Sequence, residues 1–450
     1  MRKRIFSDRV FFTKLLGISV PIALQNLMLA LVATADAFML GMINQNAMSA
    51  VSLATQIQFV QNMIVGGIVS TTSILGAQYW GKRDLKSMNF IFILSLKISA
   101  FISAVFSVLC IFFPEFLMVI FTNEPELIQI GAEYLRIAGF SYFLTGISQI
   151  YLVVMKVSDH AKLTAVISSV TVLLNIFLNS ILIFGLLGFP AFGARGAALA
   201  TLVSRIIEIA WCVAASFGKN FIHPKFCVQD SDKKGLFYDF FKCMLPLVGA
   251  FIFWGVGFTS YSAFMGHLGK NAAAANSVAA VVRDLVCCLC NGLAAGAGIV
   301  VGNELGAGNL ENGKLYGDRL FVIAFICGLL STLIMLILTP FVMNFVKLTM
   351  EARSLLKGMM LIMSFYMIGR AINSILINGI FDCGGDTLFD MYSLAVCMWG
   401  IAVPFAALGT FVFHWPVLVI YACTCLDEVG KIPWVVYHYK KYKWVRDLTR

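Results

Sequence analysis

Long apolar stretches follow one another along almost the whole chain, and short polar segments separate them. Each stretch is long enough for a helix that crosses a bilayer, which takes about 20 residues. Because hydrocarbon offers the backbone no hydrogen bonds, such stretches are expected to be helical. The pattern predicts twelve spans, at residues 12–42, 50–79, 88–113, 124–154, 161–186, 193–217, 236–267, 272–305, 315–346, 352–380, 387–413 and 415–438.

The first span combines a proline, Pro21, with an acid, Asp36. A carboxylate inside a span is costly and by default marks a functional site. The alternative is an acid at the outer mouth, because Asp36 lies only about 8 Å from the helix end at 1.5 Å per residue. Gln25 and Asn26 precede Asp36 by about three turns and fall near the same stripe of the helix.

The two halves of the chain resemble each other at an offset of 225 residues. The matching pairs include Pro21 and Pro246, Gly41 and Gly266, and Gly81 and Gly306. A polar loop at 218–235 separates the halves, so we expect an N-terminal six-helix lobe at 1–217 and a C-terminal lobe at 236–450, as an all-α parallel repeat. Such repeats place substrate and ion sites between the halves and work by alternating access. A duplicated scaffold without transport is the alternative.

Composition agrees with a polytopic membrane protein, since 60% of residues are hydrophobic and 12% are charged, against about a quarter charged in soluble domains. The two tails and the even-numbered loops, with the span ends beside them, hold 23 of the 33 Lys and Arg, whereas the odd-numbered loops hold 5. The positive-inside rule then predicts two cytoplasmic termini in a cell membrane. Topology explains the basic charge without nucleic acid.

Residues for covalent or metal chemistry do not converge. Most of the twelve cysteines fall within spans, and the five histidines lie near span ends without clustering. This pattern predicts neither an enzyme nor a metal site nor a cofactor. Gly76 to Lys82 resembles a phosphate-binding loop, but Arg83 follows and no strand precedes it. We therefore expect a monomer whose partners are small organic molecules and the bilayer.

Other polar side chains inside spans are candidates to line a cavity, because an unsatisfied amide or charge in hydrocarbon is costly. Asn175 and Asn179 lie four residues apart on one helix face, where interhelical hydrogen bonding and ion contact are both open. The remaining candidates are Gln61, Asn62, Tyr142, Gln149, Arg283, Tyr366, Arg370 and Asn373.

Charged residues differ between the halves. Position 261, the counterpart of Asp36, is a tyrosine. Arg283 and Asp284 are adjacent and point about 100° apart, so we expect them not to cancel each other and expect Arg283 or Arg370 to reach a cavity. Two charged pairs spaced three residues apart are expected to be structural: Glu133 with Arg136, and Arg205 with Glu208.

Several ordered motifs in both halves resemble the multidrug and toxic compound extrusion (MATE) family. They are ADAFMLGMINQNAMSAV, ILGAQYWGKRD, NIFLNSILIFG with GARGAALAT, AAANSVAAV, IVVGNELGAGN and CGGDT. The resemblance implies twelve helices in two six-helix lobes and a central cavity. It also implies antiport of H⁺ or Na⁺ against organic, often cationic or amphipathic, compounds.

The same resemblance implies roles for single residues. It places the family's coupling acid at Asp36, its helix-bending proline at Pro21 and its fifth-helix polar positions at Asn175 and Asn179. Na⁺, if it is the coupling ion, is expected near Asp36. Some relatives carry aspartate where this chain has Asn179, and the helix-7 glutamate and helix-10 aspartate of others have no match, which leaves Asp36 as the best single coupling acid.

These departures also open a second hypothesis about the cargo. A lobe in which Arg283 and Arg370 face the cavity would favour anionic or zwitterionic compounds. The alternative function is therefore a flippase for a lipid-linked pyrophosphate oligosaccharide or another anionic amphipathic cargo.

Overall fold

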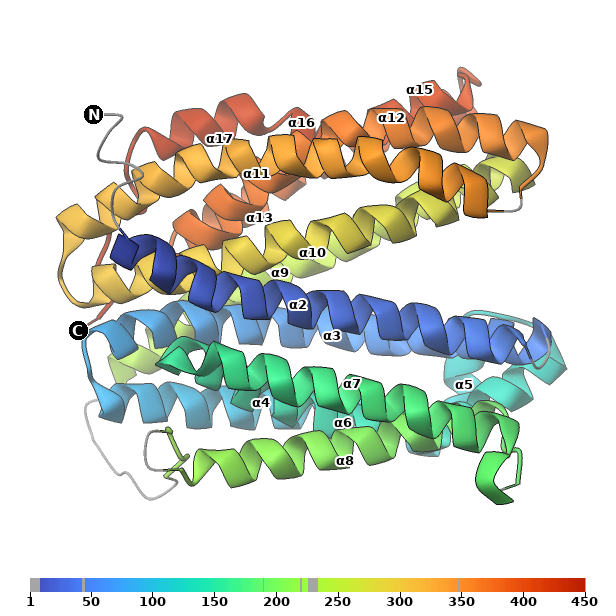
Figure 1. Cartoon of the computed structure of the whole chain (residues 1–450), viewed down its shortest axis with the longest axis horizontal. Helices are drawn as coiled ribbons and strands as arrows, with labels where there is room; N and C mark the ends of the chain where they lie inside the picture. Colours follow the sequence, from blue (N-terminus) through green and yellow to red (C-terminus); the bar gives the residue numbers. More distant parts are fainter. Residues whose placement is uncertain are drawn as a thin grey trace. The chain divides into compact units, whose positions relative to one another are not determined.

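The computed structural model describes residues 9–42, 45–188, 190–218, 221–225, 234–346 and 348–449, without the side chains at 32–38, 41 and 45. The regular structure of these residues is helical (Figure 1). Ten helical stretches among them are long and apolar enough to cross a membrane. The chain is therefore a multi-pass membrane protein.

The first half begins with two long uninterrupted helices. Its elements are α2 (Arg9–Gly41), α3 (Gln45–Gly81), α4 (Leu85–Phe112), α5 (Pro114–Val119), α6 (Pro125–Met155), α7 (Ala161–Phe184) and α8 (Ala194–Ser216). Pro21 lies inside α2, and the helix runs through it. Proline has no N–H to donate, so the backbone at this position has one hydrogen bond fewer.

The second half has more interruptions. It contains α9 (Lys234–His267), α10 (Lys270–Gly306), α11 (Leu310–Phe345), α12 (Met350–Asn373), η3 (Ser374–Phe381), α13 (Thr387–Leu394), η4 (Ala395–Ala402), α14 (Val403–Phe411), α15 (Val417–Thr424), α16 (Leu426–Val429) and α17 (Ile432–Tyr439). The expected single span at 415–438 is thus three short helices in this structure.

Twelve crossings account for these elements. The stretch Pro125–Phe184 has 60 residues, which would make a straight helix of about 90 Å, three times the hydrocarbon thickness. Ser158 and Asp159 have non-helical backbone angles within it, and this break separates α6 from α7 as two crossings. The broken segment α15–α17 supplies the last crossing, in agreement with two six-helix lobes.

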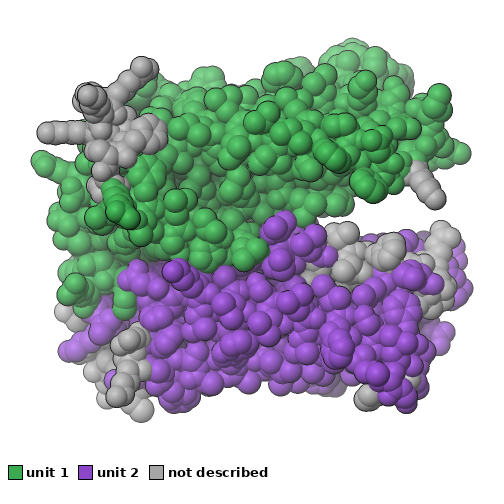
Figure 2. Space-filling view, in the orientation of Figure 1, with its two compact units in different colours: residues 1–24, 77–83, 236–450 green, residues 25–76, 84–235 purple. Residues whose placement is uncertain are grey.

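Contacts divide the chain into two compact units, coloured separately in Figure 2: unit 1 comprises 1–24, 77–83 and 236–450, and unit 2 comprises 25–76 and 84–235. In unit 2, α6 packs against both α4 and α8. Its core contains Leu135, Ala138, Tyr142 and Ala198. Burial of these apolar side chains holds the unit together.

In unit 1, α10 packs against α11, α12 and η3. Its glycines permit close approach to the first half of α2. A Cβ at Gly292 would overlap Ala23, and one at Gly296 would overlap Ser19. These glycines therefore allow close packing of the two helices.

The end of α3 and the end of α10 make a reciprocal contact within unit 1. Gly81 leaves no room for a Cβ because the carbonyl of Asn303 touches it, and Gly306 is touched in the same way by the carbonyl of Gln78. Gln78 and Asn303 are themselves 225 residues apart, as are the two glycines. The internal repeat is therefore also present in the packing.

The C-terminal segment is fixed onto this contact region. The Gln78 Nε2 donates to the carbonyl oxygens of Cys383 at 2.6 Å and Arg446 at 3.2 Å. The backbone N–H of Leu448 donates to Gln78 Oε1 at 2.6 Å. Trp444 is fully buried. The tail is thus held against unit 1 as far as Leu448.

Candidate functional site

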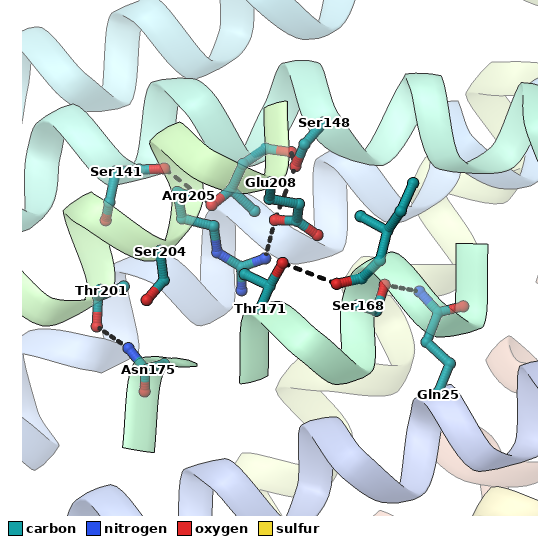
Figure 3. A network of polar contacts seen from close by, with 12 residues as sticks. Gln25, Ser141, Ser148, Ser168, Thr171, Asn175, Thr201, Ser204, Arg205 and Glu208 are labelled. Atoms are coloured by element: carbon teal, nitrogen blue, oxygen red, sulfur yellow. Dashed lines mark hydrogen bonds and ion pairs between the residues drawn. The ribbon is translucent and has the colours of Figure 1, made fainter. Parts of the chain in front are cut away.

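A buried polar network in unit 2 connects α2, α7 and α8. Gln25 is 1% exposed, and its Nε2 donates to Ser168 Oγ at 2.7 Å. On α7, Asn179 Nδ2 donates to Asn175 Oδ1 at 3.1 Å, and Asn175 Nδ2 donates to Thr201 Oγ1 at 3.3 Å. Figure 3 shows Gln25 and Asn175 at opposite ends of this network. The structure thus brings three predicted site residues, Gln25, Asn175 and Asn179, together along one face of α7.

A charged pair lies in the same region. The guanidinium of Arg205 pairs with Glu208 at 2.5 Å, and Ser148 Oγ donates to Glu208 at 3.4 Å (Figure 3). This confirms the predicted pair. The other predicted pair is wrong: Glu133 binds Arg195, and Arg136 binds Glu115. Partners from neighbouring helices offer better geometry than the residue one turn away.

Asp36 lies in the helical backbone of α2, but its side chain is outside the described residues. Its orientation and the expected Na⁺ position beside it therefore stay predictions. Asn26 is half-buried, and Gln149 on α6 is also half-buried.

Gln61 and Tyr142 belong to the interior of unit 2. Gln61 is 1% exposed, and its Nε2 donates to Ser103 Oγ at 3.0 Å and to the Tyr142 carbonyl at 2.9 Å. Tyr142 is fully buried in the hydrophobic core. Both residues thus take part in the interior packing of unit 2. Asn62 is exposed.

Gln61→Ala is expected to lower the free energy of unfolding in detergent by about 1–3 kcal/mol, because it leaves buried polar groups on α4 and α6 without a donor. Asn62→Ala is the matched control. Its exposed amide is expected to change stability by at most about 0.5 kcal/mol. Thermal unfolding followed by intrinsic fluorescence measures both. Equal losses in the two variants would contradict this assignment.

Unit 1 contains a buried charge cluster around Glu428 of α16, which is 2% exposed. Arg370 Nη1 lies 2.8 Å from its Oε1, and Lys431 Nζ lies 3.1 Å from its Oε2. Asn373 Nδ2 donates to Glu428 Oε2 and to its carbonyl, both at 2.7 Å. Glu428 therefore accepts from three donors at once. Two of them, Arg370 and Asn373, were candidates from the sequence, and the third, Lys431, was not.

Arg283 is paired with its neighbour Asp284, whose Oδ1 lies 2.9 Å from both Nε and Nη2 of Arg283. The expectation that adjacent residues do not cancel each other is wrong, because the long arginine side chain folds back to the acid. The guanidinium also lies 4.6 Å from the centre of the Phe258 ring, where a cation–π attraction adds to its binding. Tyr366 is buried nearby and interacts with Arg283 and Arg370.

Sequence reasoning missed three ionisable residues of this cluster: Asp427, Glu428 and Lys431. The available signal was the run LDEVGK inside an otherwise apolar span. Asp427 lies beside Tyr261, the repeat counterpart of Asp36. The second half thus does have an acid near that position, but the last span supplies it and the seventh does not.

A separate cavity lies between the end of α11 and the start of α12. Its lining includes Leu336, Pro340, Met343, Met350, Arg353 and Lys357. It contains none of the predicted cavity residues. Among the described residues, no group of three His, Cys, Asp or Glu side chains has the placement of a metal site.

A family model, MatE, matches the chain twice, at residues 21–181 and 246–408. The chain belongs to the MATE family. The two MatE matches begin 225 residues apart, which is the offset of the internal repeat. Members of this family are transporters, and the coarse function of the chain is therefore membrane transport.

Curated relatives and solved structures agree with membership in the MATE family. The chain is 22% identical to the uncharacterized transporter YisQ of Bacillus subtilis, covering 89% of this chain and 88% of the relative. It is 22% identical to the probable multidrug resistance protein NorM of Bacillus licheniformis, with 88% of each covered. A mutant of the Vibrio cholerae MATE transporter VcmN aligns with TM-score 0.88 at 15% identity, covering 96% and 97% of the chains.

A MOP superfamily transporter from Pyrococcus furiosus aligns with TM-score 0.86 at 16% identity and 96% coverage of both chains. At such identities the likeness concerns the fold. It supports the MATE arrangement of twelve helices in two lobes.

Proposed function

We propose that the chain is a secondary active antiporter that exports drug-like amphipathic, often cationic, compounds in exchange for H⁺ or Na⁺. Membership in the MATE family and similarity to probable multidrug resistance proteins support this proposal. In it, the chain works as a monomer without a cofactor. It lies in the cell membrane with both termini in the cytoplasm.

The observation that carries the proposal is the polar face of α2. Gln25 is buried and bound to Ser168 of α7, and it precedes Asp36 by eleven residues, about three turns of the same helix. Polar groups in apolar surroundings cost free energy. A stripe of them inside a membrane span therefore marks a functional site by default. Asp36 continues this stripe and is the proposed coupling acid.

Coupling follows from the two charge states of Asp36. Binding of H⁺ or Na⁺ removes its net charge and changes the hydrogen bonds that α2 makes with its neighbours. An ion can shift the transporter between its conformations only if it binds them with different affinity. The amides of Gln25, Asn175 and Asn179 are the groups proposed to respond, since they already exchange hydrogen bonds between α2, α7 and α8.

The alternative, export of a pyrophosphate-linked lipid, depended on cationic side chains that face a cavity. Arg370 is bound to Glu428, and Arg283 is bound to Asp284. Neither arginine offers an uncompensated charge to an anionic cargo. The observation that favoured this alternative is thereby lost.

A proteoliposome assay with ethidium as the cationic probe tests the proposal under separate proton and sodium gradients. The intact chain is expected to move ethidium with one of the two gradients. Asp36→Asn is expected to reduce this flux to the level of protein-free liposomes, because it cannot change charge. Fluorescence of the probe with encapsulated DNA measures the flux.

Glu126→Gln is the matched control, since Glu126 is an exposed acid at the start of α6. It is expected to transport like the intact chain. Gradient-driven flux that survives in Asp36→Asn would remove Asp36 from the mechanism. Flux that needs no gradient at all would replace the antiporter by a channel.

A further inference from the structure

Asp427 is a buried acid, and the nearby cations form their ion pairs with another residue. It is 2% exposed, and its Oδ1 has no hydrogen-bond partner among the described residues. The direct ion pairs of Arg370 and Lys431 both go to the neighbouring Glu428. Burying an ionised carboxylate without such a partner is costly.

A count of charges over the whole cluster also shows fewer cations than acids. Asp390 of α13 interacts with Glu428, Arg370 and Lys431, and Asp427 interacts with the same three residues. Two cations thus face three acids, so the fully ionised cluster would carry one net negative charge. Asp382, which is buried and interacts with Asp390 and Asp386, adds an acid and no cation. The pair Arg283–Asp284 is neutral by itself.

The surroundings of Asp427 come from several elements. Tyr261 of α9 faces it, at the position that the internal repeat equates with Asp36. The titratable and charged groups that interact with Asp427 are Tyr261, Tyr366, Arg370, Cys397, Tyr421, Cys425, Glu428 and Lys431. Only two of these groups are cations, and both are bound to Glu428.

The helix that carries Asp427 is also short and interrupted. The last span is interrupted on both sides of α16, since α15 ends at Thr424 and α17 begins at Ile432. Irregular backbone at membrane depth is tolerated where it is covered by protein or lines a polar cavity. Transporters use such broken helices at their coupling-ion sites.

From this geometry we infer that Asp427 binds one exchangeable proton, so that the cluster of unit 1 is a proton site in addition to the one proposed at Asp36. Asp427 is assigned the proton in preference to Asp390 because Asp390 is only half-buried. Loss of the proton to bulk water leaves one net negative charge on the group formed by Arg370, Asp390, Asp427, Glu428 and Lys431, and this charge attracts a cationic cargo. Rebinding of the proton cancels that attraction.

The role in export rests on the proposed antiport, but the proton site itself can be tested without transport. Infrared difference spectra of the full chain in lipid nanodiscs, recorded between acidic and alkaline pH, report the carbonyl stretch of protonated carboxyl groups. We expect a band that Asp427→Asn removes and that Asp36→Asn leaves in place. A band that survives Asp427→Asn and disappears in Asp390→Asn or in Asp382→Asn would overturn the assignment.

Tyr261→Phe provides a second test that keeps the acid and changes only its neighbour. It is expected to shift the frequency and the pH midpoint of the same band. This variant decides the matter if Asp427→Asn does not fold. A band unchanged by the loss of the tyrosine hydroxyl would then overturn the inference.

The transport consequence is measured with ethidium at zero membrane potential. Asp427→Asn is expected to move one proton fewer per cargo molecule. The steady-state ratio of ethidium concentrations across the membrane then falls about tenfold for each pH unit of gradient. An unchanged ratio would remove Asp427 from coupling. Absence of gradient-driven flux in the intact chain would refute the antiport proposal alone, because the infrared band does not depend on it.

Discussion

Replacing Glu428 with alanine is expected to lower the free energy of unfolding by about 3–5 kcal/mol, as for other buried ion pairs that lose one partner. The change leaves Arg370, Lys431 and the Asn373 amide without their shared acceptor. All three residues are buried or nearly so, and water does not replace the lost carboxylate at low cost. Unfolding of the purified chain in detergent, by heat or by denaturant, measures the loss.

Two variants separate this effect from a general sensitivity to charge. Glu115→Ala removes an acid whose partner Arg136 is about half exposed, and exposed pairs contribute at most about 1 kcal/mol. Glu428→Gln keeps acceptor oxygen and shape but removes the charge, and should lie between the two. If Glu428→Ala were no more harmful than Glu115→Ala, the cluster would not contribute to stability.

Replacing Gly306 with alanine is expected to destabilise the chain by about 1–3 kcal/mol or more, the range of overpacking in a well-packed interior. The new methyl group would overlap the backbone carbonyl of Gln78. A backbone group inside a helix cannot turn away as a side chain can. The ends of α3 and α10 must therefore separate, which also disturbs the hydrogen bonds of Gln78 with the C-terminal tail.

Gly266→Ala is the control for the Gly306 substitution. Gly266 is also a helical glycine, but a Cβ there meets nothing within 4 Å. Alanine at such a site is expected to stabilise the helix by roughly 0.5–1 kcal/mol. Opposite signs of the change in unfolding temperature are therefore expected for the two glycines. A loss at Gly266 as large as that at Gly306 would exclude steric contact as the cause.

The sequence predicts the fold well because its signals are long or repeated. Apolar stretches locate the spans, and the 225-residue offset identifies the repeat, since membrane helices need a fixed length and duplicated halves keep their glycines. Hydropathy is less informative for the last span, where α15, α16 and α17 replace one helix. Two acids and a lysine within an apolar run were the signal in the sequence that this span is irregular.

The candidate site is less predictable, because its partners are distant in sequence. Arg370 binds a residue 58 positions away, and Glu133 binds one 62 positions away. Local spacing indicates which residues share a helix face but not which neighbour reaches them. The same limit explains why Tyr261 gave no sign that Asp427 lies beside it.

The glycine contact also bears on how the chain arose. Ala77 and Gly302 occupy equivalent places in the two halves, and a Cβ on Gly302 would lie 3.0 Å from the Ala77 Cβ. A residue that meets its own equivalent lies next to a two-fold axis, as in an isologous homodimer. Two copies of a half-length ancestor would have formed this interface with every contact made twice. In the present chain the two halves differ, and the amide of Gln78 binds the chain's own C-terminal segment.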